Sequence, residues 1–394
     1  MDVLSEQVAA LARAGHEGQS TQVQWREGVP FLVNAFWTAR QRQGHRLHEV
    51  SYRACFKPQL PAFFIERLTQ PGDLVHDPFM GRGTTAIQSA LMGRRVAGND
   101  INPLSALLVR PRLNTPEQAS VVARLAEIDW EGGEAGPVEL LSFYHPETLA
   151  RLMALRAWFV RREAEGQFDA VDDWIRMVAL NRLTGHSSGF FSVYTLPPNQ
   201  AVSVKSQDRI NERRGQVPPI RDVAAIIARK SRALLADGPL TSPGPLLLTG
   251  DSAATPALAD GSVQLVVTSP PFLDIVQYAQ DNWLRCWFAG IDAQAVPISM
   301  HRKAADWVAF VRRTLGELAR VVRTGGHVAF EVGEVRGGSL PLEILVLEAF
   351  QDLPFCVDCV LLNVQDFSKT ANCWGVGNNS LGVNSNRIVL ARRL

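Results

Sequence analysis

The feature that most restricts how this chain folds is the segment from Val75 to Asp100. It begins with a short expected strand, turns through D-P-F-M-G-R-G at residues 77–83, and has helical character at residues 86–92. A second short expected strand follows and ends at the acid Asp100. This order of strand, glycine turn, helix and strand is typical of α/β proteins, which bind ligands at the carboxyl ends of their strands. We therefore expect an α/β fold with a ligand site at this turn.

The residue types in this segment suit a ligand with an anionic group and a ribose. Gly81 and Gly83 let the backbone approach a ligand closely, and Thr84 and Thr85 can cap the following helix, whose amides face an anion. Asp100 is placed to bind a ribose diol, as the acid of a dinucleotide fold does. The spacing is not G-x-G-x-x-G, which disfavours a nicotinamide or flavin cofactor. An ordinary strand-to-helix connection is the alternative interpretation.

A second motif follows the apolar run at residues 263–267, which predicts a buried strand. The sequence T-S-P-P-F at residues 268–272 places a hydroxyl, two fixed carbonyls and an aromatic face at the mouth of a sheet. Such a set suits a flat nitrogenous base with an exocyclic amine. A proline-rich turn without a ligand is the alternative interpretation.

Together, the two motifs resemble those of the S-adenosylmethionine (SAM)-dependent amino-methyltransferases of DNA, specifically the N4-cytosine branch. In that family D-P-F-x-G-x-G-T-T binds the methionine part of SAM and S-P-P-[YF] holds the target base. The resemblance extends to residues 56–64 as the first cofactor-binding helix and to Asp251, the acid that contacts the adenine amine. Residues 325–333 and 386–390 resemble later strands of the sheet, so that about half of the chain is covered.

The resemblance implies a Rossmann-like methyltransferase fold: a mostly parallel seven-stranded sheet with helices on both faces, plus a mostly helical insertion. The implied catalytic residues are Ser269, Pro270, Pro271 and Phe272. The implied cofactor-binding residues are Phe56, Lys57, Pro58, Asp77, Pro78, Phe79, Gly81, Gly83, Thr84, Thr85, Asp100, Ile101, Asp251 and Ser252. This chain departs from many N4-cytosine enzymes because its cofactor motif comes first, and because Phe272 replaces the more usual tyrosine.

The resemblance also implies a mechanism. Ser269 Oγ and the Pro270 carbonyl would accept hydrogen bonds from the cytosine amine and aim its lone pair at the methyl group, with the prolines fixing the carbonyl. The base must leave the DNA stack, and Phe272 would replace the lost stacking. In this family, serine at this position goes with cytosine N4, whereas aspartate or asparagine goes with adenine N6. An N6-adenine DNA or RNA methyltransferase, and a non-catalytic nucleic-acid-binding protein that retains SAM, are the alternatives.

The pattern along the chain predicts three regions. Residues 1–55 form an N-terminal arm, whose aromatic residues favour a helix packed on the core over a DNA-facing arm. Residues 56–103 and 246–394 form the catalytic domain. Residues 104–245 form an inserted, mostly helical target-recognition region, with helices expected at residues 149–160 and 174–183.

Within the insertion, a loop rich in small polar and aromatic residues precedes a basic run. Residues 205–232 hold eight basic and three acidic side chains, whereas the net charge of the whole chain is only +1. The DNA-binding residues that we expect are Ser187, Ser188, Asn199, Gln200, Lys205, Arg209, Arg213 and Arg214. A solvated basic helix next to a loop that covers the cofactor is the alternative.

Composition adds only broad limits. The chain has 394 residues, 46% of them hydrophobic, and no apolar run of membrane-spanning length, so we expect a cytoplasmic protein. The five cysteines suggest no disulfide framework, no metal site and no Pro-Cys nucleophile of the cytosine carbon-5 enzymes. The partners that we expect are SAM, double-stranded DNA and, in a restriction-modification system, a cognate endonuclease; an orphan modification enzyme and any oligomeric state are left open.

Overall fold

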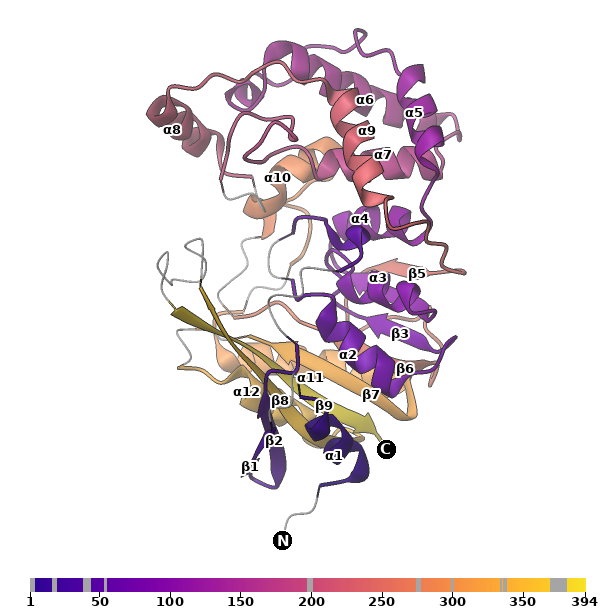
Figure 1. Cartoon of the computed structure of the whole chain (residues 1–394), viewed down its shortest axis with the longest axis vertical. Coiled ribbons are helices and arrows are strands. Elements are labelled where there is room, and N and C mark those ends of the chain that lie inside the picture. The colour runs from indigo at the N-terminus through magenta and orange to yellow at the C-terminus, as the bar shows by residue number, and fades with distance from the viewer. Residues whose placement is uncertain are drawn as a thin grey trace.

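The computed structural model describes residues 4–15, 20–37, 44–52, 55–196, 201–273, 278–298, 301–333, 335, 339–368 and 381–394. Within these residues one nine-stranded sheet has the strand order β1-β2-β8-β9-β7-β6-β3-β4-β5. Helices cover both of its faces, and a group of further helices forms the opposite end of the molecule (Figure 1).

The central strands run parallel because each is followed by a crossover rather than a hairpin. They are β3 (Leu74–Asp77), β4 (Arg95–Asp100), β5 (Leu246–Thr249), β6 (Val263–Thr268) and β7 (Val322–Val332). The last two strands are β8 (Phe355–Ser368) and β9 (Leu381–Arg393), and β9 lies antiparallel to both β7 and β8. The seven strands from β8 to β5 form the expected α/β sheet, with the central strands buried on both faces.

Strand β6 shows why both faces need helices. Leu265 and Val267 pack on one face with α1 (Glu6–Arg13) and α2 (Gln59–Leu68). Val266 points to the other face, where it packs with α11 (Ala304–Val321) and α12 (Leu342–Phe350). Since side chains alternate along a strand, an unbroken apolar run fills two cores at once.

The N-terminal arm differs from the expectation of a packed helix alone. Helix α1 does bury Val8 and Leu11, but the arm also contains the hairpin of β1 (Gln22–Arg26) and β2 (Val29–Asn34). Strand β2 pairs in parallel with β8 and so extends the sheet to nine strands. The turn at Glu27 and Gly28 has positive φ at both residues, as two-residue hairpins require, and Glu-Gly is a weak sequence signal for it.

The helices that lie between β4 and β5 in the chain pack against one another and against helices that adjoin the sheet. They are α4 (Pro103–Leu113), α5 (Gln118–Glu127), α6 (Pro146–Ala164), α7 (Ala170–Leu180), α8 (Val204–Arg214) and α9 (Val223–Leu234). Short 3₁₀ helices occur at Arg46–His48 and Val138–Ser142, and α3 (Thr84–Leu91) follows β3. One hydrophobic cluster joins these helices to α3 and to α10 (Tyr278–Ala289), so α10 belongs spatially with the helical end although it follows β6 (Figure 1).

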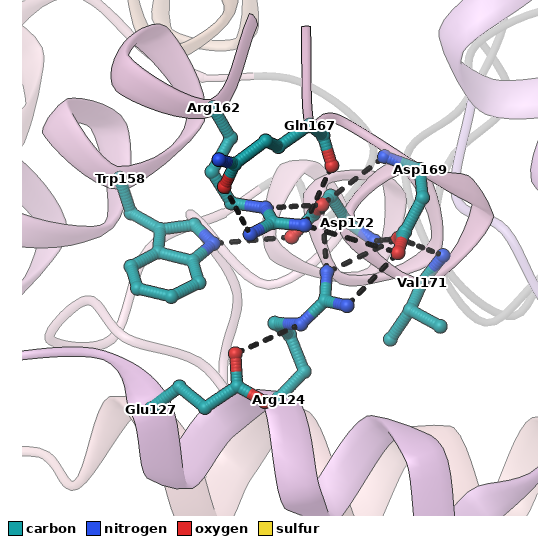
Figure 2. Close-up of polar contacts among 8 residues, drawn as sticks. All are labelled: Arg124, Glu127, Trp158, Arg162, Gln167, Asp169, Val171 and Asp172. Carbon is teal, nitrogen blue, oxygen red and sulfur yellow. Dashed lines mark hydrogen bonds and ion pairs between the residues drawn. The ribbon is translucent and has the colours of Figure 1, made fainter. Parts of the chain in front are cut away.

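Charged side chains fasten three of these helices together. Asp172 on α7 is fully buried and accepts hydrogen bonds from Trp158 Nε1 (3.1 Å) and Arg162 Nε (2.7 Å) of α6. Arg124 of α5 pairs with Asp172 (2.7 Å) and with Asp169, which caps α7 (Figure 2). A buried carboxylate is tolerated only when it is paired in this way, so the cluster fixes how α5, α6 and α7 meet. None of the described helices has the length and apolarity needed to cross a membrane.

Candidate functional site

A cavity of about 350 Å³ lies at the carboxyl ends of β3, β4, β5 and β6. Both motifs contribute to its wall, although almost 170 residues of chain separate Asp100 from Ser269. The lining residues that the sequence predicted are Pro78, Phe79, Gly81, Asp100, Ile101, Asp251, Ser252, Ser269, Pro270, Pro271 and Phe272. Its volume is in the range of small-molecule sites, and the carboxyl edge of a parallel sheet is where such sites occur.

The glycine turn between β3 and α3 adopts a conformation that other residues rarely reach. Gly81 has φ +50° and Gly83 has φ +77°, and a Cβ on Gly83 would collide with Val109 of α4. Two requirements therefore coincide at Gly83, a left-handed backbone and close packing on α4. Gly81 faces the cavity, whereas Gly83 is buried behind it.

The prediction that Thr84 and Thr85 cap α3 is wrong. Gly83 occupies the cap position without a side-chain bond, and both threonines lie buried inside the first turn. Thr84 Oγ1 accepts from Arg82 Nε (3.2 Å), and the Thr85 hydroxyl donates to the Val267 carbonyl of β6 (2.9 Å). The hydroxyls thus tie the turn to its neighbours, because the helix begins one residue earlier than a threonine cap would require.

Asp100 combines a structural contact with a place on the cavity wall. Its Oδ2 accepts from the Gly81 amide (2.7 Å) and its Oδ1 from the Asn102 amide (2.9 Å). Burial raises the pKa of this carboxyl, and the two amide bonds oppose the rise. A carboxylate has about four acceptor positions, so these bonds leave capacity for hydroxyl groups of a ligand.

Asp77 lies outside the cavity wall. Its Oδ1 accepts from the Thr268 hydroxyl (2.6 Å) and from the Phe79 amide (3.1 Å), which joins the end of β3 to the end of β6. Burial raises the pKa of Asp77 to about 7. In the structure, the hydrogen bond between Asp77 and Thr268 therefore links the first motif directly to the second.

The other predicted cofactor residues fall into two groups. Asp251 pairs with Arg313 of α11 (2.9 Å) and Ser252 Oγ lies 2.8 Å from Thr314 Oγ1, so both line the cavity while fastened to α11. The residues that do not line the cavity are Phe56, Lys57, Pro58, Asp77, Gly83, Thr84 and Thr85. Of these, Phe56 packs beside α2 and accepts from Arg82 through its carbonyl (3.3 Å).

Buried groups position the second motif. The Ser269 hydroxyl donates a hydrogen bond to Glu331, a buried carboxyl near the end of β7, and burial raises the pKa of Glu331. Asn386 Nδ2 of β9 donates to Glu331 Oε1 (2.9 Å). Ser269 is thus held by an acceptor that would leave its oxygen lone pairs for another donor. The sequence did not reveal Glu331, although a glutamate within an apolar strand is a usable signal.

The carbonyl and the ring of the motif are also held in place. The Pro271 carbonyl accepts from Trp307 Nε1 of α11 (2.9 Å), and Trp307 is fully buried. The Phe272 ring lies against the backbone of Gly333, where an added Cβ would come within 2.8 Å of Cε2. The motif's other proline carbonyl belongs to Pro270, which also lines the cavity.

Further lining residues were missed by the sequence reasoning. Asp281 and Asn282 on α10 are 6% and 4% exposed and line the cavity, as does Tyr52, which lies over Gly81. Gly250, Pro297, Ile298 and Phe310 complete the wall. Adjacent polar residues on a buried helix were the available signal for the α10 pair.

The expected DNA-binding residues lie at the helical end of the molecule. Lys205, Arg209 and Arg213 are exposed and recur every four residues on α8, so they share one helix face. Arg214 stacks over the Tyr194 ring (3.8 Å). Ser187 and Ser188 are exposed on the preceding loop, whereas Asn199 and Gln200 lie outside the described residues.

The chain is similar in sequence to known DNA methyltransferases over its first part. Residues 13–106 match the family model N6_N4_Mtase, described as DNA methylase. The type II methyltransferase M.MjaII of Methanocaldococcus jannaschii is 39% identical over 74 residues, 19% of this chain and 14% of the relative. The type II methyltransferase M.MvaI of Kocuria varians is 33% identical over 89 residues, 22% of this chain and 19% of the relative. The matches thus span less than a fifth of either relative.

A structural comparison gives TrmN from Thermus thermophilus, with a TM-score of 0.36 and 11% identity over 89% of this chain and 52% of that chain. The sequence match contains the glycine turn and Asp100 and ends before the second motif. The strand order and the shared cavity place that second motif beside the matched segment. Over residues 13–106, the chain is thus similar to the DNA methylases of the N6/N4 amino-methyltransferase family.

Proposed function

We propose that this protein transfers the methyl group of SAM to the N4 amine of a cytosine flipped out of duplex DNA. The observation that carries the proposal is the single cavity that both the glycine turn and the S-P-P-F segment line. Methyl transfer requires donor and acceptor within about 3–3.5 Å of each other, so a shared cavity is a condition of the reaction.

The cavity wall suits SAM. Its acidic side chains, Asp100, Asp251 and Asp281, would attract a cationic sulfonium, and the rings of Phe79 and Phe310, 5.6 Å apart, offer apolar faces. Asp100 would hold the ribose hydroxyls through its remaining acceptor positions. When bound, SAM supplies an electrophilic methyl group.

The second motif would orient the amine. The Ser269 hydroxyl donates a hydrogen bond to Glu331, so its oxygen lone pairs can accept a hydrogen bond from the amine. The Pro270 carbonyl would be the second acceptor, because the Pro271 carbonyl already accepts from Trp307. Two acceptors fixed before the base arrives spare the cost of arranging them during the reaction. Phe272, held against Gly333, would stack on the base.

DNA would be held outside the cavity. We propose that residues 104–245 recognise the target, with Lys205, Arg209 and Arg213 on phosphates and the loop of Ser187 and Ser188 near bases. The serine of the motif favours cytosine N4 through the family resemblance, and adenine N6 is the alternative target. A cognate restriction endonuclease is the partner that a restriction-modification role would add.

A labelling experiment tests the proposal. The protein is incubated with methyl-labelled SAM and either duplex DNA or RNA, and the nucleic acid is digested to nucleosides. Label in N4-methylcytosine from DNA is expected. Label in N6-methyladenine would favour the alternative, and label in RNA alone would contradict a DNA substrate. Ser269→Ala serves as the control for catalysis by this site.

A further inference from the structure

The cavity contains more acceptors than donors among the side chains of its described wall. Asp100, Asp251 and Asp281 are carboxylates, which only accept when ionised. Of the two serines, Ser269 donates to Glu331 and Ser252 shares a hydrogen bond with Thr314. A flipped base would nevertheless present a ring acceptor beside its amine, N3 in cytosine or N1 in adenine. On the described wall, the side chains that can still donate to this edge are Tyr52 and Asn282. The Tyr52 hydroxyl accepts from Asn102 Nδ2 (3.4 Å), and Tyr52 lies over Gly81 in the glycine turn, whereas Asn282 lies on α10.

Asn282 on α10 has the chemistry for that contact. It lines the cavity together with the S-P-P-F segment and is 4% exposed. Its Oδ1 accepts from Arg285 Nη1 (3.0 Å). A guanidinium can only donate, so the amide must turn its oxygen toward Arg285 and its Nδ2 group to the other side.

Arg285 is itself held on several sides, which makes this orientation stable. Its Nη2 donates to the Ser51 carbonyl (2.8 Å) and its Nε to the Leu180 carbonyl of α7 (3.4 Å). Its guanidinium also lies 5.9 Å from the centre of the Tyr52 ring, and its side chain is buried with 9% exposed. Neighbouring chain segments, rather than α10 alone, therefore set the direction of the Asn282 amide.

We propose that Asn282 donates a hydrogen bond from Nδ2 to the ring acceptor beside the target amine, N3 of the flipped cytosine. The contact orients the ring about the amine that Ser269 and Pro270 bind, and it selects bases whose edge carries an acceptor. Arg285 acts through Asn282 as a positioning residue. The inference rests on the proposed function, because it assumes that the base enters this cavity.

Two substitutions separate recognition from folding. Asn282→Asp keeps an oxygen for Arg285 and gains a charge pair, so the fold is retained, but it replaces the donor by an acceptor. Asn282→Ala removes both. Gln280→Ala, an exposed amide on the same helix, is the matched control. We expect kcat/KM for DNA to fall roughly ten- to hundredfold in Asn282→Ala and further in Asn282→Asp. The SAM dissociation constant and thermal unfolding of Asn282→Asp should match those of Gln280→Ala.

A base analogue identifies the contact. In a duplex whose target cytosine is replaced by 3-deazacytosine, a C–H group takes the place of N3. On this duplex the kcat/KM of the wild-type protein should exceed that of Asn282→Ala by much less than it does on cytosine. An unchanged kcat/KM in Asn282→Ala, or an undiminished advantage on the analogue, would overturn the inference. If the wild-type protein forms N6-methyladenine, the proposed function fails and the same comparison is made with 1-deazaadenine. If no DNA base is methylated, both fall.

Discussion

The S-P-P-F wall of the cavity and helix α8 differ in how they are held. The wall is fixed by buried groups from distant strands and helices, with Glu331 on Ser269 and Trp307 on the Pro271 carbonyl. Helix α8 lies at the margin of the helical end of the molecule (Figure 1). It buries Gln207 and docks by side-chain hydrogen bonds, while Lys205, Arg209 and Arg213 are exposed. Groups that must hold a reacting atom are preorganised, whereas phosphate contacts tolerate exposed and adaptable side chains.

The largest effect should come from Ser269→Ala, which removes an acceptor from the rigid wall. We expect kcat to fall about 10²- to 10³-fold, as when one preorganised hydrogen-bonding group is lost from a catalytic site. The SAM dissociation constant, measured by calorimetry, should stay nearly the same. An equal loss of SAM binding would show that Ser269 supports the fold rather than the reaction.

Asp100→Ala tests the cofactor side of the same cavity. Loss of its hydrogen bonds to hydroxyl groups should weaken SAM binding by about 1.5–3 kcal/mol, roughly ten- to a hundredfold in the dissociation constant. Because Asp100 also accepts from the Gly81 amide, Asp100→Asn is the milder companion variant. An unaltered dissociation constant in Asp100→Ala would contradict the ribose assignment.

The pH dependence of kcat should reflect the ionisation of Glu331. Burial raises its pKa, so kcat should fall as the pH falls through that raised value and Ser269 loses its anionic acceptor. Glu331→Gln should be slower by about tenfold at neutral pH and should lack this acid limb. A raised folded-state pKa means that the folded protein binds the proton more tightly, so ionised Glu331 costs stability as the pH rises. Glu331→Gln should accordingly unfold at the same or a higher temperature than the wild-type protein at neutral pH. If Glu331→Gln kept the fall of kcat at acidic pH, that fall could not be assigned to protonation of Glu331.

The smallest effect on chemistry should come from α8. Arg209→Gln with Arg213→Gln should weaken DNA binding and reduce the slope of log K against log salt by roughly 0.9 for each phosphate that is no longer neutralised. At saturating DNA, kcat should not change. Arg229→Gln with Arg232→Gln removes two exposed charges from α9 and is the matched control. Equal effects of the two pairs would mean that α8 contributes only general charge.

Local sequence patterns predicted much of the fold. Gly81 and Gly83 mark a turn that few other residues could form, and the unbroken apolar run before Ser269 indicated a strand buried on both faces. The hairpin of β1 and β2 was missed because its pairing partner, β8, lies more than 300 residues later. The threonine caps were wrong because a hydroxyl pattern does not say which residue begins a helix.

The order of residues by itself determined the two motifs, since each depends on neighbours in the chain: glycines for a left-handed turn, and prolines for a restricted carbonyl. Only the tertiary structure decided which side chains act on those motifs. Glu331 and Trp307 reach the second motif from β7 and α11, and Asn282 lines the same cavity from α10. Such contacts arise from the crossing of elements far apart in the chain, and no local spacing encodes them.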